Sequence, residues 1–255
     1  MNKIINKLDE IQDEQKIAIL FACEAGSRAR GLESENSDYD VRFIYVHPRD
    51  WYLRVDLEAQ RDVIEYPLDD KLDISGWDIR KALQLLYKSN PSIIEWLQSS
   101  IVYKKSNSFY EDVKTLLKKF YSPYSCFNHY LSMVYRNVKN LDKEKIVGAK
   151  NFINMIRPVL VLNWIEQSHQ VPPNDLSTLA GQVISDQNLY YAIEQLVKSK
   201  KHNTEFNNPD NIRLLNNFVS TELDRLKKAV PPKQPTTRDK SELNQLFLDT
   251  VNSVS

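Results

Sequence analysis

The hydrophobic pattern changes near residue 105, and this change constrains the fold more than any other feature of the chain. Before it, one amphipathic helix over residues 3–14 is followed by runs that predict strands over 17–23 and 39–46. After it, apolar residues recur with a period of about 3.6. This periodicity predicts five helices over residues 107–120, 124–141, 145–167, 177–200 and 209–229.

Shorter signals divide the front and back parts further. Short strands are expected over 62–66 and 71–74, with a turn at 67–70 between them. Ser75 and Asp78 have the spacing of a capping box and predict the start of a helix. Asn90-Pro91 and Asn208-Pro209 predict two more helix starts, because proline suits the first helical position.

Two further proline signals shape the back part. Pro158 lies within the periodic run 145–167 and is expected to kink or restart that helix. Prolines after residue 230 predict a stiff connector, followed by a short helix from about residue 241. The domains expected are therefore a front domain over 1–105, a helical domain over 106–230, and a connector with a short helix over 231–255.

Composition excludes several classes of protein. Hydrophobic residues make up 42% and charged residues 27% of the chain, which is typical of a globular protein and not of a disordered one. Two cysteines, Cys23 and Cys126, are too few for a disulfide framework and favour a reducing compartment. The charged N-terminus and the short apolar runs favour neither a signal peptide nor a membrane span. A cytoplasmic protein without a membrane partner is therefore expected.

The net charge is zero but unevenly distributed. Residues 1–100 contain 13 Lys and Arg against 19 Asp and Glu, and residues 101–255 contain 21 against 15. An acidic half and a basic half suit a site that holds cations on one side and anions on the other. Solvated helix faces account for the same numbers equally well.

Two short segments carry the chemistry. Gly26-Ser27 directly follows the first buried strand, and Asp38-Tyr39-Asp40 opens the next. Side chains two apart on a strand share a face, so Asp38 and Asp40 repel unless a cation lies between them. Oxygen ligands favour Mg²⁺ or Mn²⁺. Gly26 lets the backbone approach a ligand, and Ser27 can donate to a phosphate.

An acidic pair beside a phosphate-binding loop is the design of two-metal phosphoryl or nucleotidyl transfer, which needs a third carboxylate on a neighbouring strand. Asp73 is the first candidate because it lies in a short strand, Glu65 is the second, and Asp78 is the third. Turn and cap chemistry alone also accounts for an Asp-x-Asp after Ser-Glu-Asn-Ser, so the order and strand context carry the prediction.

The segments GSRARGLESENSDYDVRFIYVHP and LDISGWDIRKALQLLYKSNPSIIEWLQSSIVY resemble the DNA polymerase β nucleotidyltransferase superfamily, and more closely its RNA-repair-pathway family. The resemblance implies a small mixed, mostly antiparallel sheet followed by an all-α domain. It implies that Asp38 and Asp40 bind two metal ions, that Asp73 binds the catalytic one, and that Gly26 and Ser27 hold the β- and γ-phosphates. Tyr39 departs from the aliphatic residue usual in the superfamily, although a large apolar ring can still pack beneath the sheet.

Three basic residues are candidates for nucleotide binding. Arg28 directly follows Ser27 and suits a bidentate phosphate contact. Arg42 shares the face of Asp40 and either holds the triphosphate or pairs with the acidic cluster. Lys150 shares a helix face with Arg157, and that face either contacts the triphosphate or is a solvated basic stripe.

The function expected is transfer of a nucleoside monophosphate from a nucleoside triphosphate to an acceptor hydroxyl, with two Mg²⁺ or Mn²⁺ ions and release of pyrophosphate. The resemblance favours an RNA (tRNA-like) 3′ end as the acceptor. The alternatives are a small-molecule or protein acceptor, as in antibiotic-modifying and antitoxin-like relatives, and a non-catalytic nucleotide-binding regulatory module. The sequence determines neither the base preference nor the oligomeric state.

Overall fold

A five-stranded sheet forms the centre of one of two units in the computed structural model, which describes residues 2–69, 71–141, 148–233 and 238–254. Unit 1 comprises Met1–Ala29, Asp38–Tyr121 and Thr236–Ser255, and unit 2 comprises Arg30–Ser37 and Ser122–Pro235. The domain boundaries expected after residues 105 and 230 stay predictions, because a unit defined by contacts is not shown to fold independently.

The sheet has the strand order β3-β4-β2-β1-β5 in the part of the chain that the structure describes. Its strands are β1 (Ala18–Glu24), β2 (Tyr39–Val46), β3 (Val63–Asp69), β4 (Leu72–Asp78) and β5 (Val102–Lys105). Strands β2 and β4 are parallel, and the other three neighbouring pairs are antiparallel. The mixed, mostly antiparallel sheet expected from the sequence is thus confirmed.

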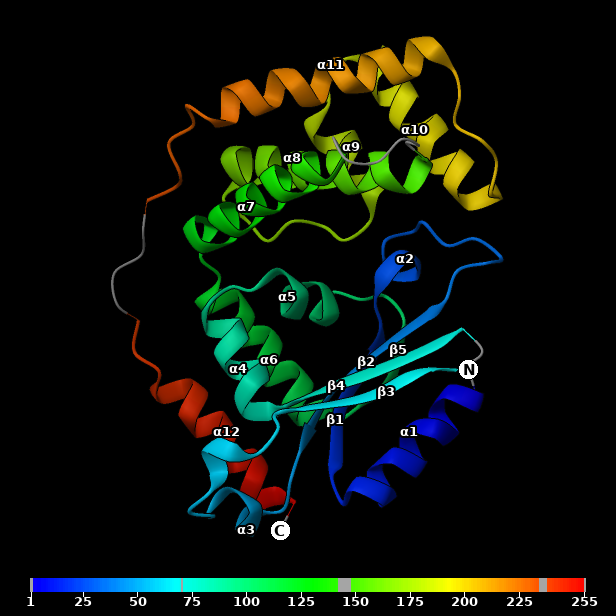
Figure 1. The fold of residues 1–255 in the computed structure, drawn as a ribbon. Coiled ribbons are helices and arrows are strands. Elements are labelled where there is room, and N and C mark those ends of the chain that lie inside the picture. Colours follow the sequence, from blue (N-terminus) through cyan, green and yellow to red (C-terminus); the bar gives the residue numbers. More distant parts are fainter. Residues whose placement is uncertain (1, 70, 142–147, 234–237, 255) are drawn as a thin grey trace. The chain divides into compact units, whose positions relative to one another are not determined.

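Helices cover both faces of the sheet (Figure 1). Helix α1 (Asn2–Gln15) buries its apolar side against residues such as Val41 and Phe43, which alternate along β2. On the other face, α4 (Ile79–Tyr87) contacts β2 and β4, and α6 (Asn107–Phe120) contacts β1. The core of unit 1 therefore lies on both sides of the central strands.

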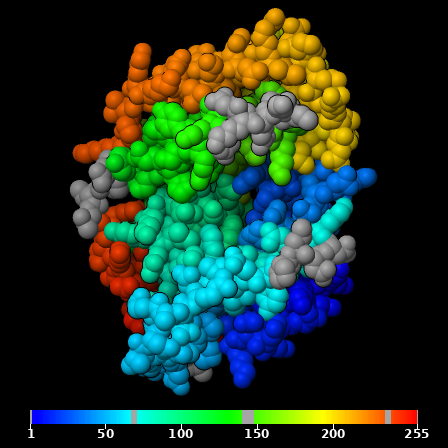
Figure 2. All heavy atoms as spheres, viewed as in Figure 1, coloured from blue at the N-terminus to red at the C-terminus, as the bar shows by residue number. Residues whose placement is uncertain are grey.

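Smaller elements complete unit 1. They are α2 (Gly26–Ala29), α3 (Arg49–Tyr52), the 3₁₀ helix η1 (Leu57–Ala59), α5 (Pro91–Leu97) and α12 (Ser241–Ser253). The segment that carries α3 and η1 lies at the surface of the unit (Figure 2, light blue), where Leu53 and Val55 are exposed. Helix α12 packs against α4 and α6 with Leu243 and Leu246 buried, so the last described helix belongs to the same unit as the first.

The helices of unit 2 surround α8. They are α7 (Pro123–Leu141), α8 (Ala149–Ser168), α9 (Leu176–Val183), α10 (Gln187–His202) and α11 (Pro209–Leu226). Helix α8 contacts each of the other four and buries most of its side chains, so it is the centre of this unit. All regular elements of unit 2 in the described residues are helices, which confirms the all-α prediction for the back part of the chain.

Local signals at the asparagine–proline pairs are confirmed. Asn90 caps α5 by accepting a hydrogen bond from the Ser92 N–H, and Asn208 caps α11 in the same way. The capping box at Ser75 is wrong, because β4 continues to Asp78 and pairs with strands on both sides. Asp78 itself is the N-cap of α4, and its carboxylate accepts from the Arg80 N–H at 2.8 Å.

One expected helix is divided in the structure, and one strand lies where none was expected. The helix expected over 177–200 is two helices, because Asp186 caps the start of α10. Helix α8 continues through Pro158, so of the two outcomes expected there the restart is wrong and the kink stays a prediction. Strand β5 gave no clear signal, since it is only four residues long and is held by its pairing with β1. The start of the helix expected over 145–167 and part of the turn at 67–70 lie outside the described residues.

Among the described residues, none of the helices is both long and apolar enough to cross a membrane.

Candidate active site

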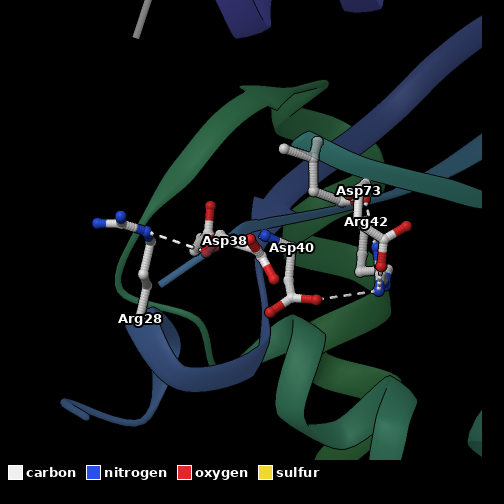
Figure 3. A network of polar contacts seen from close by, with 7 residues as sticks. Arg28, Asp38, Asp40, Arg42 and Asp73 are labelled. Atoms are coloured by element: carbon white, nitrogen blue, oxygen red, sulfur yellow. Dashed lines mark hydrogen bonds and ion pairs between the residues drawn. The ribbon is translucent and has the colours of Figure 1, made fainter. Parts of the chain in front are cut away.

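The parallel pairing of β2 and β4 places two of the expected acidic residues opposite each other. Asp40 of β2 is in register with Asp73 of β4, and paired residues of neighbouring strands lie side by side on one face of a sheet. Arg42 lies two residues after Asp40 and reaches both carboxylates, as Figure 3 shows. The long-range pairing of the strands therefore assembles the acidic pair.

Arg42 bridges the two carboxylates. Its Nη2 donates to Asp40 Oδ1 at 3.2 Å and to Asp73 Oδ2 at 2.7 Å. Its Nη1 donates to the backbone carbonyls of Val41 and Asp73, each at 3.0 Å. The Arg42 side chain is only 18% exposed, so these contacts are partly shielded from water. Of the two roles that the sequence left open for Arg42, pairing with the acidic cluster is present in the structure.

Gly26 lies directly against the Asp40 carboxylate. Its φ of +58° is in the left-handed region, and a Cβ atom built there would lie 1.8 Å from Asp40 Oδ2. The backbone is held in this position because the N–H of Ala25 donates to the carbonyl of Asp40 at 2.8 Å. Only glycine therefore fits here without displacing the carboxylate. Ser27 follows it within the single turn of α2.

Arg28 is tied to the start of β2. Its Nε donates to the carbonyl of Asp38 at 3.2 Å, and its guanidinium lies 3.9 Å from the centre of the Tyr39 ring. Tyr39 is 39% exposed, so its ring does not take the buried position beneath the sheet that its size would allow. The ring instead supports Arg28 by a cation–π contact, a geometry that an aliphatic residue does not provide. Asp38 itself is exposed just before β2.

Glu24 is a buried carboxylate that the sequence analysis did not nominate. It ends β1, has no exposed surface, and accepts a hydrogen bond from the Asp40 N–H at 2.8 Å through Oε1. Its other oxygen accepts from the hydroxyl of Tyr103. Burial raises the pKa of Glu24, and the hydrogen bonds from Tyr103 and Asp40 oppose that shift. The signal in the sequence was a charged residue at the end of an apolar run, separated from the Gly26-Ser27 loop by one residue.

The carboxylate oxygens of this site are chemically suited to a divalent cation such as Mg²⁺, which prefers oxygen ligands. The oxygens of Asp40 and Asp73 converge on one atom, Arg42 Nη2, so a positive charge is already the partner of both. In the described part of the chain, however, no three His, Cys, Asp or Glu side chains are grouped so that they could hold a metal ion. The acidic pair therefore fits a metal ion in its chemistry, but a guanidinium lies between the two carboxylates.

The remaining candidates lie in different surroundings. Glu65 of β3 pairs with Arg61 at the surface, at 2.8 Å. Asp78 is buried as the cap of α4 and accepts from the hydroxyl of Tyr52 at 2.7 Å, and burial raises its pKa to about 6. Of the three candidates for the third carboxylate, Asp73 is thus the one seen beside Asp40 in the described residues. Lys150 is exposed in α8 of unit 2, and its contact with a nucleotide stays a prediction.

The chain belongs to the RNA repair pathway DNA polymerase beta family, whose model matches residues 1–249. This family assignment confirms the resemblance described from the sequence. The chain is thus a member of a polymerase-β-like nucleotidyltransferase family, and its mixed, mostly antiparallel sheet agrees with that assignment.

Two relatives illustrate the similarity. The chain is 38% identical over 253 residues to the uncharacterized protein YcgL of Bacillus subtilis (strain 168), covering 99% of this chain and 96% of the relative. A nucleotidyltransferase-like protein from Exiguobacterium sibiricum 255-15, known from a crystal structure, is 14% identical. That similarity covers 98% of this chain and 89% of the other, with a TM-score of 0.33.

Proposed function

We propose that the protein is a metal-dependent nucleotidyltransferase that transfers a nucleoside monophosphate from a nucleoside triphosphate to an acceptor hydroxyl and releases pyrophosphate. The observation that carries the proposal is the convergence of the Asp40 and Asp73 carboxylates on one cationic atom, directly beside Gly26. The family supports it, and the RNA repair pathway in the family's name favours an RNA (tRNA-like) 3′ end as the acceptor.

Each residue then has a distinct task. Asp38, Asp40 and Asp73 would hold Mg²⁺ or Mn²⁺, two ions in all, and the bound metal would stabilise the charge that develops on the triphosphate. Asp73 is placed on the neighbouring strand from Asp40, where its carboxylate can accept the proton of the attacking hydroxyl. Glu24 is a positioning residue, because it holds the backbone N–H of Asp40 from inside the unit.

The triphosphate needs its own contacts. Gly26 and Ser27 offer a backbone surface without a Cβ at the first position, which lets phosphate oxygens approach closely. Arg28 would orient the leaving pyrophosphate, and the Tyr39 ring beneath it restricts the directions the guanidinium can take. Lys150 and Arg42 are further candidates for phosphate contacts.

The test uses the four nucleoside triphosphates, each labelled at the α-phosphate, with Mg²⁺ or Mn²⁺ and total cellular RNA. The matched variants are Asp40→Ala, and Asp112→Ala at an exposed carboxylate on α6. Label transferred to RNA by the wild type and Asp112→Ala, but not by Asp40→Ala, is the expected result, and it gives the base preference as well.

Other results would redirect the proposal. Label in a small molecule or a protein, with the same dependence on Asp40, would retain the reaction and change the acceptor. Triphosphate binding without any transfer would instead indicate a regulatory module. Equal transfer by Asp40→Ala and the wild type would refute the role of the acidic pair.

A further inference from the structure

Arg42 occupies the position at which the two carboxylates of the candidate active site would share a cation. One nitrogen, Nη2, contacts Asp40 Oδ1 at 3.2 Å and Asp73 Oδ2 at 2.7 Å (Figure 3). Magnesium–oxygen distances are about 2.0–2.1 Å, so a metal ion and Nη2 cannot share this position. Binding a metal between these carboxylates therefore requires Nη2 to leave them.

The other half of the guanidinium is held differently. Nη1 donates to the carbonyls of Val41 and Asp73, each at 3.0 Å, and these bonds involve backbone atoms of two paired strands. They do not depend on the carboxylates. Arg42 can consequently give up the contacts of Nη2 while it remains anchored in the sheet through Nη1.

We infer that Arg42 is a resident counter-ion that competes with the divalent metal for Asp40 and Asp73. It holds the two carboxylates together when no metal is bound, and it yields them when a divalent cation binds. This inference rests on the proposed function, because it takes Asp40 and Asp73 as metal ligands. The displaced Nη2 is then available to a phosphate oxygen. Arg42 would thus pair with the carboxylates before the metal binds and contact the triphosphate afterwards.

The competition sets the direction and size of the expected effect. A positive charge within hydrogen-bonding distance of a carboxylate weakens the binding of other cations there, by about 10- to 1,000-fold when the other cation is a proton. Removing the charge of Arg42 should therefore tighten metal binding. Arg42→Gln keeps a side-chain amide that can donate to a backbone carbonyl but carries no charge, and Arg42→Lys keeps the charge.

The experiment measures Mn²⁺ affinity of the full chain by isothermal titration calorimetry, without nucleotide. We expect Arg42→Gln to bind Mn²⁺ at least about tenfold more tightly than the wild type does. The Mn²⁺ affinity of Arg42→Lys should be close to that of the wild type. Arg61→Gln is the matched control, because Arg61 pairs with Glu65 at the surface. Equal or weaker binding by Arg42→Gln would overturn the inference.

Asp40→Asn separates this inference from the proposed function. If that variant loses Mn²⁺ binding while Arg42→Gln binds like the wild type, the proposed metal site stands and the competition fails. If neither the wild type nor Arg42→Gln binds Mn²⁺, or if Asp40→Asn binds it normally, both fail.

A second measurement follows metal binding in the wild type, and a variant serves only to assign the signal. The arginine side-chain NMR signals are followed during titration with Mg²⁺, and the Arg42 signal is assigned by its loss in Arg42→Lys. We expect the Arg42 signal to shift as Mg²⁺ binds. An unchanged signal at saturating Mg²⁺ would overturn the inference.

Discussion

The close approach of Gly26 to Asp40 makes Gly26→Ala the most direct test of the site geometry. The φ of Gly26 is +58°, and a Cβ atom would lie 1.8 Å from Asp40 Oδ2 and 2.6 Å from Asp40 Cγ. The backbone of Asp40 is fixed in β2, so the carboxylate has to rotate away from the new methyl group. Alanine therefore acts on both the local backbone and the bridge from Asp40 to Arg42.

The magnitude follows from two terms. A left-handed conformation costs a residue with a Cβ about 1–2 kcal/mol. Losing the contact between Asp40 and Arg42 costs about 1 kcal/mol, because the pair is partly exposed. We expect the free energy of unfolding to fall by about 2–3 kcal/mol in total. Mn²⁺ affinity and nucleotide transfer should fall as well, since the carboxylate no longer faces Asp73.

Urea unfolding followed by tryptophan fluorescence is a suitable assay, because the stacked rings of Trp77 and Trp96 lie in unit 1 with centroids 3.7 Å apart. Gly181→Ala is the matched control. Its Cβ would meet nothing closer than 3.7 Å, and alanine within helix α9 should stabilise by about 0.5–1 kcal/mol. A Gly26→Ala protein with the stability and Mn²⁺ affinity of the wild type would refute this description of the site.

Three further predictions concern groups that support the site or unit 1. Glu24→Ala should lower the free energy of unfolding by about 1–3 kcal/mol, since it leaves the Asp40 N–H and the Tyr103 hydroxyl without their acceptor. Glu24→Gln should lower it by less, and thermal unfolding and nucleotide-transfer assays compare the two variants. Burial lowers the pKa of His47 from 6.5 to about 4, so its contribution to stability is complete above pH 6.5 and is lost as the pH falls towards 4. His47→Phe, which keeps a ring against Trp51, should therefore lose about 1 kcal/mol less than the wild type between pH 7 and pH 5 in urea unfolding, since solvent around the half-buried ring reduces the effect of the full shift; an identical loss would show that burial of His47 does not cause this pH dependence. Arg238→Ala should increase amide hydrogen exchange across α12 more than in α1, because Arg238 precedes α12 and donates to the backbone carbonyls of Phe120 and Tyr87. Unchanged exchange in α12 would show that these two hydrogen bonds do not hold the helix in place.

Local signals in the sequence predicted the parts of the fold that depend on local chemistry. The asparagine–proline pairs marked the starts of α5 and α11, and the apolar period gave the bounds of α6. The capping box at Ser75 failed because strand pairing on both sides of β4 outweighs one local hydrogen bond. The break before α10 was missed, since apolar residues keep a helical spacing across Asp186.

In the candidate site, too, local sequence predicted individual residues, whereas the contacts between them depend on pairing of distant strands. Asp73 was nominated from its place in a short strand, but its register with Asp40 depends on a parallel pairing between segments that are not adjacent in the chain. Glu24 was passed over, because an acidic residue is rarely buried unless it has partners, and its partners come from other strands. The bridge formed by Arg42 likewise depends on two strands, so the sequence left its role open.

The return of α12 to unit 1 has a consequence for the order in which the molecule is made. Chains leave the ribosome from the N-terminus, and domains generally fold as units during synthesis. The apolar surface of α4 and α6 that receives α12 must wait until residues 122–235, which belong to unit 2, have been synthesised. During that interval Tyr87 and Phe120 lack Arg238, which later lies over both rings. A nascent chain stalled before residue 238 should therefore expose the apolar surface of α4 and α6, which a chaperone can bind, whereas α12 packs against that surface in the full-length protein.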